Sequence, residues 1–252
     1  MNAQTERLQT LGFDTKLGIT LAGWESSIIA VGNFNPPLYS AWWLESVGLI
    51  GKDDRDEAIK AEGSAALANL CKFSTDWFAI QVIQNQFSIE SRGPVTHALL
   101  DLVSGIFEII RHAPVSSIGI NFQAHLKFQD IKMYHAFGDA LAPKDIWSRV
   151  KYGVGASYGL ENITVCSQPY DRKEEAESGS KVRITVQPSR KVKAGLHLTF
   201  NDHHDIEQDF KARVDTAAIA AGLIKKNWES DSNEAVRAFH DLITIALADY
   251  HR

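Results

Sequence analysis

Apolar and polar side chains alternate along residues 117–128, which predicts a β-strand covered on one face of its sheet. Residues 77–90 alternate in the same way and are rich in β-branched and aromatic side chains, which predicts one strand or two short ones. Between them, apolar side chains recur every three or four positions over residues 95–112, as in an amphipathic helix. Pro94 suits the first turn of this helix and Pro114 ends it. The middle of the chain is therefore predicted to be strand, helix, strand.

Further elements are predicted on both sides of this unit from the same two periodicities. Strands are expected at residues 26–34, 162–168, 181–187 and 195–201, and helices at residues 36–48, 130–141, around 217–226 and from 231 or 232 to 250. The charged residues 51–57 predict a turn that leads into an alanine-rich helix or loop. Residues 1–24 are expected to be an extension packed on the surface, with an edge strand or an arm onto a partner as alternatives.

These elements predict an α+β fold, with mainly antiparallel strands in one or two sheets and the amphipathic helices 95–112 and 234–250 covering them. The halves 1–114 and 115–252 share a plan of strand, short helix, further strands and long helix. We therefore consider a degenerate tandem β-α-β(n)-α duplication, with the halves packed as one compact unit. In layout this plan resembles the saddle-shaped duplicated folds of the TATA-binding type, although no residue pattern of that family occurs in the chain.

Composition narrows the class of protein. The chain has 252 residues, of which 44% are hydrophobic and 23% charged, as in an ordinary globular protein. Its net charge of −5 argues against a main role in neutralising nucleic-acid phosphates. Cys71 and Cys166 are far apart and lack a CxxC spacing, so no disulfide framework or structural zinc site is expected. No run of apolar residues is long enough to span a bilayer, and we expect a cytoplasmic location, no membrane association and no cofactor.

The most polar cluster in the chain is residues 201–205, at the end of a predicted strand. His203, His204 and Asp205 are candidate metal ligands, because imidazole and carboxylate are the groups that a divalent transition metal or a general acid–base site uses. Adjacent residues of a strand point to opposite faces, so His203 and His204 converge only if the strand ends between them. The alternative interpretation is a solvated strand end.

A basic segment over residues 181–193 is the best candidate for binding an anionic partner. Lys181 and Arg183 share one face of a predicted strand, and Arg190, Lys191 and Lys193 follow in a turn. A basic hairpin can follow a phosphate backbone, and nucleic-acid binding by Arg183, Arg190, Lys191 and Lys193 is therefore one hypothesis. The alternative is a solvated hairpin whose lysines discourage edge-to-edge strand pairing.

Trp42 and Trp43 belong to the densest aromatic cluster of the sequence. Helical neighbours diverge by roughly 100°, so one of the two indoles is a candidate for a protein interface, where tryptophan is enriched. Burial of both inside the monomer is the alternative.

Motifs that carry catalysis are missing from the sequence. It contains no GxSxG nucleophile elbow and no HExxH, and the glycine-rich residues 152–159 lack the spacing of a phosphate-binding loop. We therefore expect a non-enzymatic interaction or assembly protein that acts through protein–protein contacts, self-association included. The alternatives are a metal-assisted hydrolase that uses residues 201–205 and a nucleic-acid-binding module that uses residues 181–193.

Overall fold

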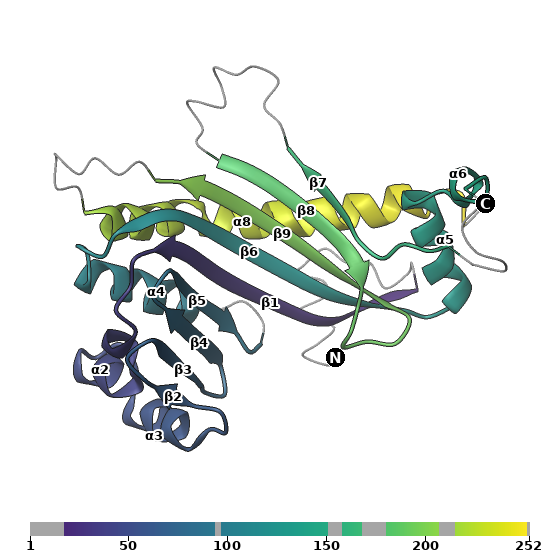
Figure 1. Cartoon of the computed structure of the whole chain (residues 1–252). Coiled ribbons are helices and arrows are strands. Elements are labelled where there is room, and N and C mark those ends of the chain that lie inside the picture. Colours follow the sequence, from purple (N-terminus) through teal and green to yellow (C-terminus); the bar gives the residue numbers. More distant parts are fainter. Residues whose placement is uncertain (1–17, 94–96, 151–157, 168–179, 207–214, 251–252) are drawn as a thin grey trace.

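The computed structural model describes residues 18–93, 97–150, 158–167, 180–206 and 215–250. These residues form a nine-stranded antiparallel sheet in the order β2-β3-β4-β5-β1-β6-β9-β8-β7 (Figure 1). The strands are β1 (Ile19–Gly32), β2 (Ala65–Ala66), β3 (Leu70–Ser74), β4 (Phe78–Ile83), β5 (Gln86–Ser91), β6 (Val115–Phe128), β7 (Ile163–Cys166), β8 (Ser180–Pro188) and β9 (Gly195–Asp205). The helices are η2 (Pro36–Tyr39), α2 (Ala41–Ser46), α3 (Lys52–Lys60), α4 (His97–Ile109), α5 (Ile131–Leu141), α6 (Lys144–Trp147) and α8 (Thr216–Ala246). The predicted α+β class, with antiparallel strands and helices packed on them, is confirmed.

The sheet is built outward from a central pair of long strands, β1 and β6, in which Ser27 lies opposite Asn121. Beyond β1 come β5, β4, β3 and β2, and beyond β6 come β9, β8 and β7. In each half the first strand is therefore central, the last strand pairs with it, and the others follow outward in reverse order. This shared connectivity agrees with the predicted plan of the two halves, while the duplication itself stays a prediction.

Helices α4 and α8 pack on one face of the sheet and lie behind it in Figure 1. The core between the layers is aromatic at its centre. Phe122 of β6 lies with its ring centroid 6.3 Å from that of Trp24 on β1 and 5.2 Å from that of Trp228 on α8. All three side chains are buried, so the middle of the sheet and the long helix share one apolar core.

The amino-terminal prediction needs a correction. Residues 19–24 begin β1 and pair with β6, whereas the pairing of β1 with β5 starts at Ser27, so residues 19–24 have a described strand on one side only. The apolar positions Ile19, Leu21 and Trp24 are buried in the core and are not part of a surface extension. Residues 1–17 lie outside the described part of the chain.

The charged residues 51–57 are also not a simple turn, because α3 begins at Lys52. The backbone N–H of Gly51 donates to the carboxylate of Asp54 at 3.2 Å, which ties down the first turn of α3. Acidic side chains in that turn and Lys60 in the last turn complement the helix dipole. Capping chemistry thus makes a helix from a segment that has little hydrophobic periodicity.

The two predicted carboxyl-terminal helices are one continuous helix, α8, of 31 residues. The polar run around Asp231 resembles the start of a new helix. Asp231 instead faces inward and is buried, so its carboxyl group does not cap the backbone. Among the described residues, no helix has the length and apolar character needed to cross a membrane.

Several local predictions are confirmed. Residues 77–90 form two strands, β4 and β5, and the three later strands are present as β7, β8 and β9. Asp130 caps α5 by accepting from the backbone N–H of Lys132 at 2.9 Å. The helix predicted at residues 36–48 is split into η2 and α2 at Ser40, which caps α2. The helix start at Pro94 and most of the glycine-rich residues 152–159 lie outside the described residues.

Candidate functional site

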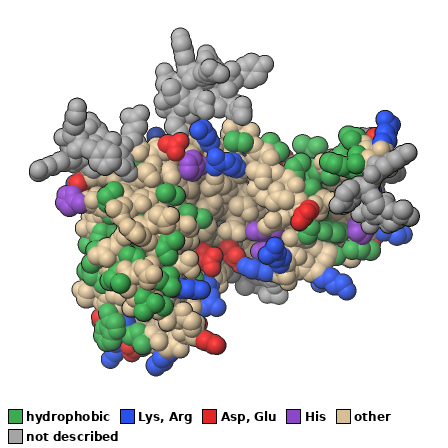
Figure 2. Space-filling model, in the orientation of Figure 1, with side chains coloured by type: hydrophobic (Ala, Val, Ile, Leu, Met, Phe, Trp, Pro, Cys, Tyr) green, Lys and Arg blue, Asp and Glu red, His purple; other side chains and the backbone are tan. Residues whose placement is uncertain are grey.

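One face of the sheet carries no described helix, and we call it the open face; it is turned toward the viewer in Figures 1 and 2. Directly paired residues of antiparallel strands point to the same side of the sheet. The strand register therefore arranges the side chains of the open face in rows that cross the strands. The first row, which we call the asparagine row, consists of Glu90, Ser27, Asn121, Asn201 and Arg183. Figure 2 shows that uncharged polar side chains and backbone occupy much of this face.

Two more rows lie beside the asparagine row on the open face. Apart from Glu25 and Gly23, their members are hydroxyl, amide and imidazole side chains. One row consists of Glu25, Gln123, Thr199, Thr185 and Thr164, and the other, which we call the histidine row, of Gly23, His125, His197 and Gln187. At the β3–β5 end the open face is hollowed by a cavity of about 420 Å³, which Lys72, Gln81 and Ser88 help to line.

Hydrogen bonds run along the asparagine row from strand to strand. The amide of Asn121 donates to the backbone carbonyl of Ser27 at 3.2 Å, and Asn201 donates to Asn121 Oδ1 at 2.8 Å. Arg183 Nη1 donates to Asn201 Oδ1 at 3.4 Å. A Cβ atom on Gly119 would come within 2.8 Å of Asn201 Nδ2, so the glycine leaves the room that this contact needs. The side chains of Asn121, Asn201 and Arg183 are therefore held in place by one another.

The imidazole of His197 is fixed by an amide on each side. Its Nε2 lies 2.8 Å from Gln123 Oε1 and its Nδ1 lies 2.8 Å from Gln187 Nε2. Because Gln123 offers an acceptor and Gln187 a donor, these contacts define a neutral ring with the proton on Nε2. The ring of His125 stacks on that of His197, with centroids 4.4 Å apart and planes 7° apart.

Both histidines favour the neutral form. Burial lowers the pKa of His197 to about 4, and the neighbouring His125 adds to this shift. Burial and the nearby ammonium of Lys191 lower the pKa of His125 as well, while Glu25 opposes the shift. At neutral pH the centre of the open face is consequently a hydrogen-bonding surface without charge on its two imidazoles.

A basic turn, residues 189–194, borders the open face where β8 leads into β9. The hydroxyl oxygen of Ser189 accepts from the backbone N–H groups of Lys191 and Val192 at 3.1 and 3.0 Å. The same oxygen lies 2.9 Å from His125 Nδ1, which ties the turn to β6. Lys191 reaches over to Glu25 of β1, with Nζ 2.5 Å from Oε1. The turn is thus fixed against the histidine row.

The predicted metal ligands are divided between the two faces of the sheet. His203 and Asp205 lie on the open face, with Nε2 and Oδ1 3.2 Å apart, whereas β9 continues past His204 and buries it on the helix-covered face. Among the described residues, no group of three or more His, Cys, Asp and Glu side chains is arranged to hold a metal ion. The structure therefore brings two of these three residues together.

His204 belongs instead to a buried polar cluster beneath α8. Its Nε2 lies 2.7 Å from Oδ2 of Asp202, whose other carboxylate oxygen accepts from the hydroxyl of Ser180. Asp231 of α8 hydrogen-bonds to Asp202, and burial together with the Asp202 charge raises the pKa of Asp231 to about 7. The carboxylate stands between serine and histidine, so this order differs from a catalytic triad, in which histidine contacts the nucleophile.

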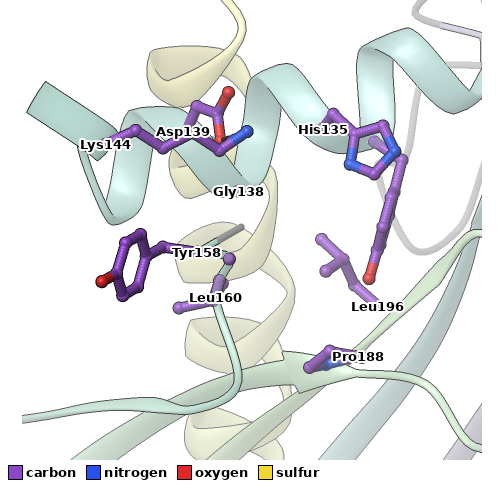
Figure 3. Close-up of a pocket in the computed structure, with 10 residues that line it drawn as sticks. His135, Gly138, Asp139, Lys144, Tyr158, Leu160, Pro188 and Leu196 are labelled. Carbon is purple, nitrogen blue, oxygen red and sulfur yellow. Dashed lines mark ion pairs between the residues drawn. The ribbon is translucent and has the colours of Figure 1, made fainter. Parts of the chain in front are cut away.

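A second concavity lies at the other side of the β8–β9 hairpin, between α5 and the strand ends (Figure 3). Its volume is about 490 Å³, and Leu160, Pro188 and Leu196 give it an apolar lining. An ion pair between Lys144 and Asp139, with 2.9 Å between Nζ and Oδ1, lies beside it. The size is that of a small-ligand site, but the ion pair satisfies its two charged groups internally.

The two tryptophans diverge, as their helical spacing requires. Trp42 is 59% exposed and has the guanidinium of Arg55 over its ring, 4.3 Å from the centroid. Trp43 is half-buried, and its ring centroid lies 6.4 Å from that of Tyr39. Trp42 is therefore the one of the pair that a partner can reach, and its interface role stays a prediction.

The sequence analysis singled out the open-face residues of the 201–205 cluster and did not recognise the others on β6 and β9, although their signal was present. Asn121, Gln123 and His125 are the polar members of the alternation that predicts β6, and His197 and Asn201 play the same part in β9. Which strands pair, and in what register, cannot be read from one strand at a time. The candidate residue Arg183 does lie on this face, in the asparagine row.

No known protein-family model matches the chain, and no curated protein was found to be related to it.

Proposed function

We propose that this protein is a non-enzymatic interaction protein that binds a partner protein on the open face of its sheet. The observation that carries the proposal is the asparagine row together with its neighbouring rows, in which the buried Ser27, Asn121 and His125 support partly exposed polar side chains on β6, β9 and β8. Side chains held by one another lose little conformational freedom on binding, and this lowers the entropic cost of association. Polar, hydrated contact surfaces are common in protein interfaces that are not obligate.

The chemistry of the open face favours binding over catalysis. Ser189 and His125 form a serine–histidine pair beside the open face, with Oγ 2.9 Å from Nδ1. The serine oxygen already accepts from two backbone N–H groups of its own turn, and the lowered pKa of His125 makes that imidazole a weak base. This pair builds the turn, and it lacks the exposed nucleophile that an acyl-transfer reaction needs.

Native mass spectrometry of the protein purified from its own cells tests the proposal. The wild-type chain is expected in a stoichiometric complex with a protein. Thr185→Arg with Thr199→Arg places two long cations in the half-buried centre of the open face and is expected to release the partner. The matched control is Ile219→Arg with Ile245→Arg, which adds the same charge on the exposed side of α8 and is expected to leave the complex intact.

A lone chain carrying one or two divalent ions would contradict the proposal and direct attention to His203 and Asp205. If only the α8 control variant lost the partner, the interface would lie on the α8 side of the molecule and not on the open face. Circular dichroism of both double variants establishes that each keeps the folded structure.

A further inference from the structure

We infer that the basic turn and Lys127 form the part of the open face that contacts acidic side chains, and that the partner is therefore an acidic protein. This inference rests on the proposed function and adds the chemistry of the partner. The turn carries Arg190, Lys191 and Lys193, and Lys127 lies on the adjoining strand β6 on the same face as His125. Within the described residues, Arg190, Lys193 and Lys127 have no acidic side chain in ion-pair contact.

The basic turn and Lys127 together form a corner of positive charge, which we call the basic corner. The chain as a whole has a net charge of −5, so positive charge is concentrated in this corner. Glu25 is the one acidic side chain in contact with the turn among the described residues, and it neutralises Lys191 only. The corner thus keeps the positive charge of its three other cations. Complementary charge at the border of an interface steers association and selects among partners.

The backbone of the basic turn is fixed before binding, which distinguishes it from a mobile basic loop. Ser189 holds two backbone N–H groups of the turn and contacts His125. At the far end of the turn, the backbone N–H of Phe128 donates to the carbonyl of Ala194 at 3.2 Å. The turn is therefore attached to β6 at both ends, next to the neutral amide and imidazole rows.

An acidic protein fits this surface better than a nucleic acid does. The paired open-face residues of the described strands include no Phe, Tyr or Trp on which bases could stack. Beyond this corner the open face carries separate cations, such as Arg183, which donates to Asn201, and Lys72 at the β3–β5 end. A phosphate backbone needs positive charge that continues along its path. Glu90 on the asparagine row would repel such a backbone. Asparagine and glutamine side chains, in contrast, pair well with peptide groups.

Fluorescence anisotropy with a labelled poly-L-glutamate peptide as the probe tests the inference on the full chain. We expect saturable binding that weakens as salt is added. Arg190→Glu with Lys193→Glu is expected to weaken this binding by about tenfold, since each exposed charge contact contributes modestly. Lys226→Glu with Arg237→Glu makes the same change in net charge on exposed positions of α8 and is expected to leave binding within about twofold.

Three results would overturn the inference: no binding of the peptide, equal weakening by the α8 control, or tighter binding of an oligothymidylate of matched charge through the same turn. The last result would indicate a nucleic-acid partner. The native complex separates this inference from the proposed function. If the Thr185 and Thr199 substitutions release the partner while the charge reversal in the turn does not, open-face binding stands and the acidic partner is wrong. If the threonine substitutions leave the complex intact, the proposed function is wrong whatever the peptide does.

Discussion

Asp231 is a carboxylic acid on α8 that is 6% exposed and lies beside Asp202 and His204 of β9. Ser180 of β8 donates to Asp202, and Glu234 of α8 adds a second negative charge. Two carboxylates this close in a poorly solvated layer cannot both be charged cheaply, so one proton is retained. The cluster therefore ties α8 to the sheet best while Asp231 is protonated.

Asp231→Asn keeps a hydrogen-bond donor at this position and removes the ionisation. In the wild type, the pKa of Asp231 is about 7 in the folded protein, which is above its value in the unfolded chain. The protonated Asp231 therefore contributes its full stabilisation below about pH 4, and this stabilisation is lost as the pH rises to 7. We expect the variant to gain about 2 kcal/mol of unfolding free energy relative to wild type between pH 5 and pH 8. Urea denaturation at several pH values measures the difference.

The exposed Asp101 of α4 provides the control, since Asp101→Asn is expected to leave the pH dependence of unfolding unchanged. A difference between wild type and Asp231→Asn that stays constant from pH 5 to pH 8 would mean that Asp231 is already ionised in the folded protein.

The histidine row has the opposite pH dependence. The folded pKa of His197, about 4, lies below the unfolded value, so the stability from the neutral ring is complete above about pH 6.5 and is lost as pH falls. Between pH 6.5 and pH 4 we expect the unfolding free energy of His197→Gln to fall by about 1 kcal/mol less than that of the wild type. This figure allows for solvent screening, because the ring is partly exposed. Thermal melts across that range decide the point, and parallel pH profiles for the two proteins would contradict it.

Replacing glycine by alanine is expected to have opposite effects on stability at two positions, one inside a helix and one after a helix end. Gly222 is exposed inside α8, and a Cβ there would meet no atom within 4 Å. Gly222→Ala is expected to stabilise the protein by about 0.5–1 kcal/mol, because alanine restricts the unfolded chain and favours helix. Gly48, which follows α2, has a φ of +77°, and Gly48→Ala is expected to cost about 1 kcal/mol. Differential scanning calorimetry of both variants checks the sign, and equal shifts would refute the argument.

How far the elements could be predicted depended on whether their signal was local. The alternation in β6 and the three- and four-residue steps in α4 are local patterns, and both elements were predicted. Asp130 could be identified as the cap of α5 for the same reason. The continuity of α8 could not be predicted, because Asp231 has the sequence signature of a helix start and only its burial against Asp202 shows otherwise.

The candidate site was less predictable than the elements, because it exists only after strands far apart in sequence have paired. Asn121 and Asn201 lie in unrelated segments, and the 2.8 Å contact between them follows from the register of β6 and β9. His203 and His204 could be identified as chemically capable residues. Their separation depends on β9 continuing to Asp205, and the sequence left that extension open.

At the centre of the whole molecule, Phe122 joins both halves and the helix layer. Phe122→Ala removes a fully buried ring that contacts Trp24 and Trp228, and we expect a loss of about 3–5 kcal/mol of unfolding free energy. Because the sheet is continuous, tryptophan fluorescence and circular dichroism are expected to report the same single transition. Two separated transitions would instead indicate halves that unfold independently.

The antiparallel pairing of β1 with β6 also constrains the order of events during synthesis. Ile28 of β1 cannot pair with Ile120 until β6 has been synthesised. In the same way, β6 cannot pair with β9 until the chain is nearly complete. Pairings between such distant segments are slow to form, and strands that have left the ribosome keep unsatisfied edges until their neighbours appear. The edge of β1 that pairs with β6 is therefore open to aggregation while residues 33–114 are synthesised, and we expect folding yield to depend on chaperones that shield this edge.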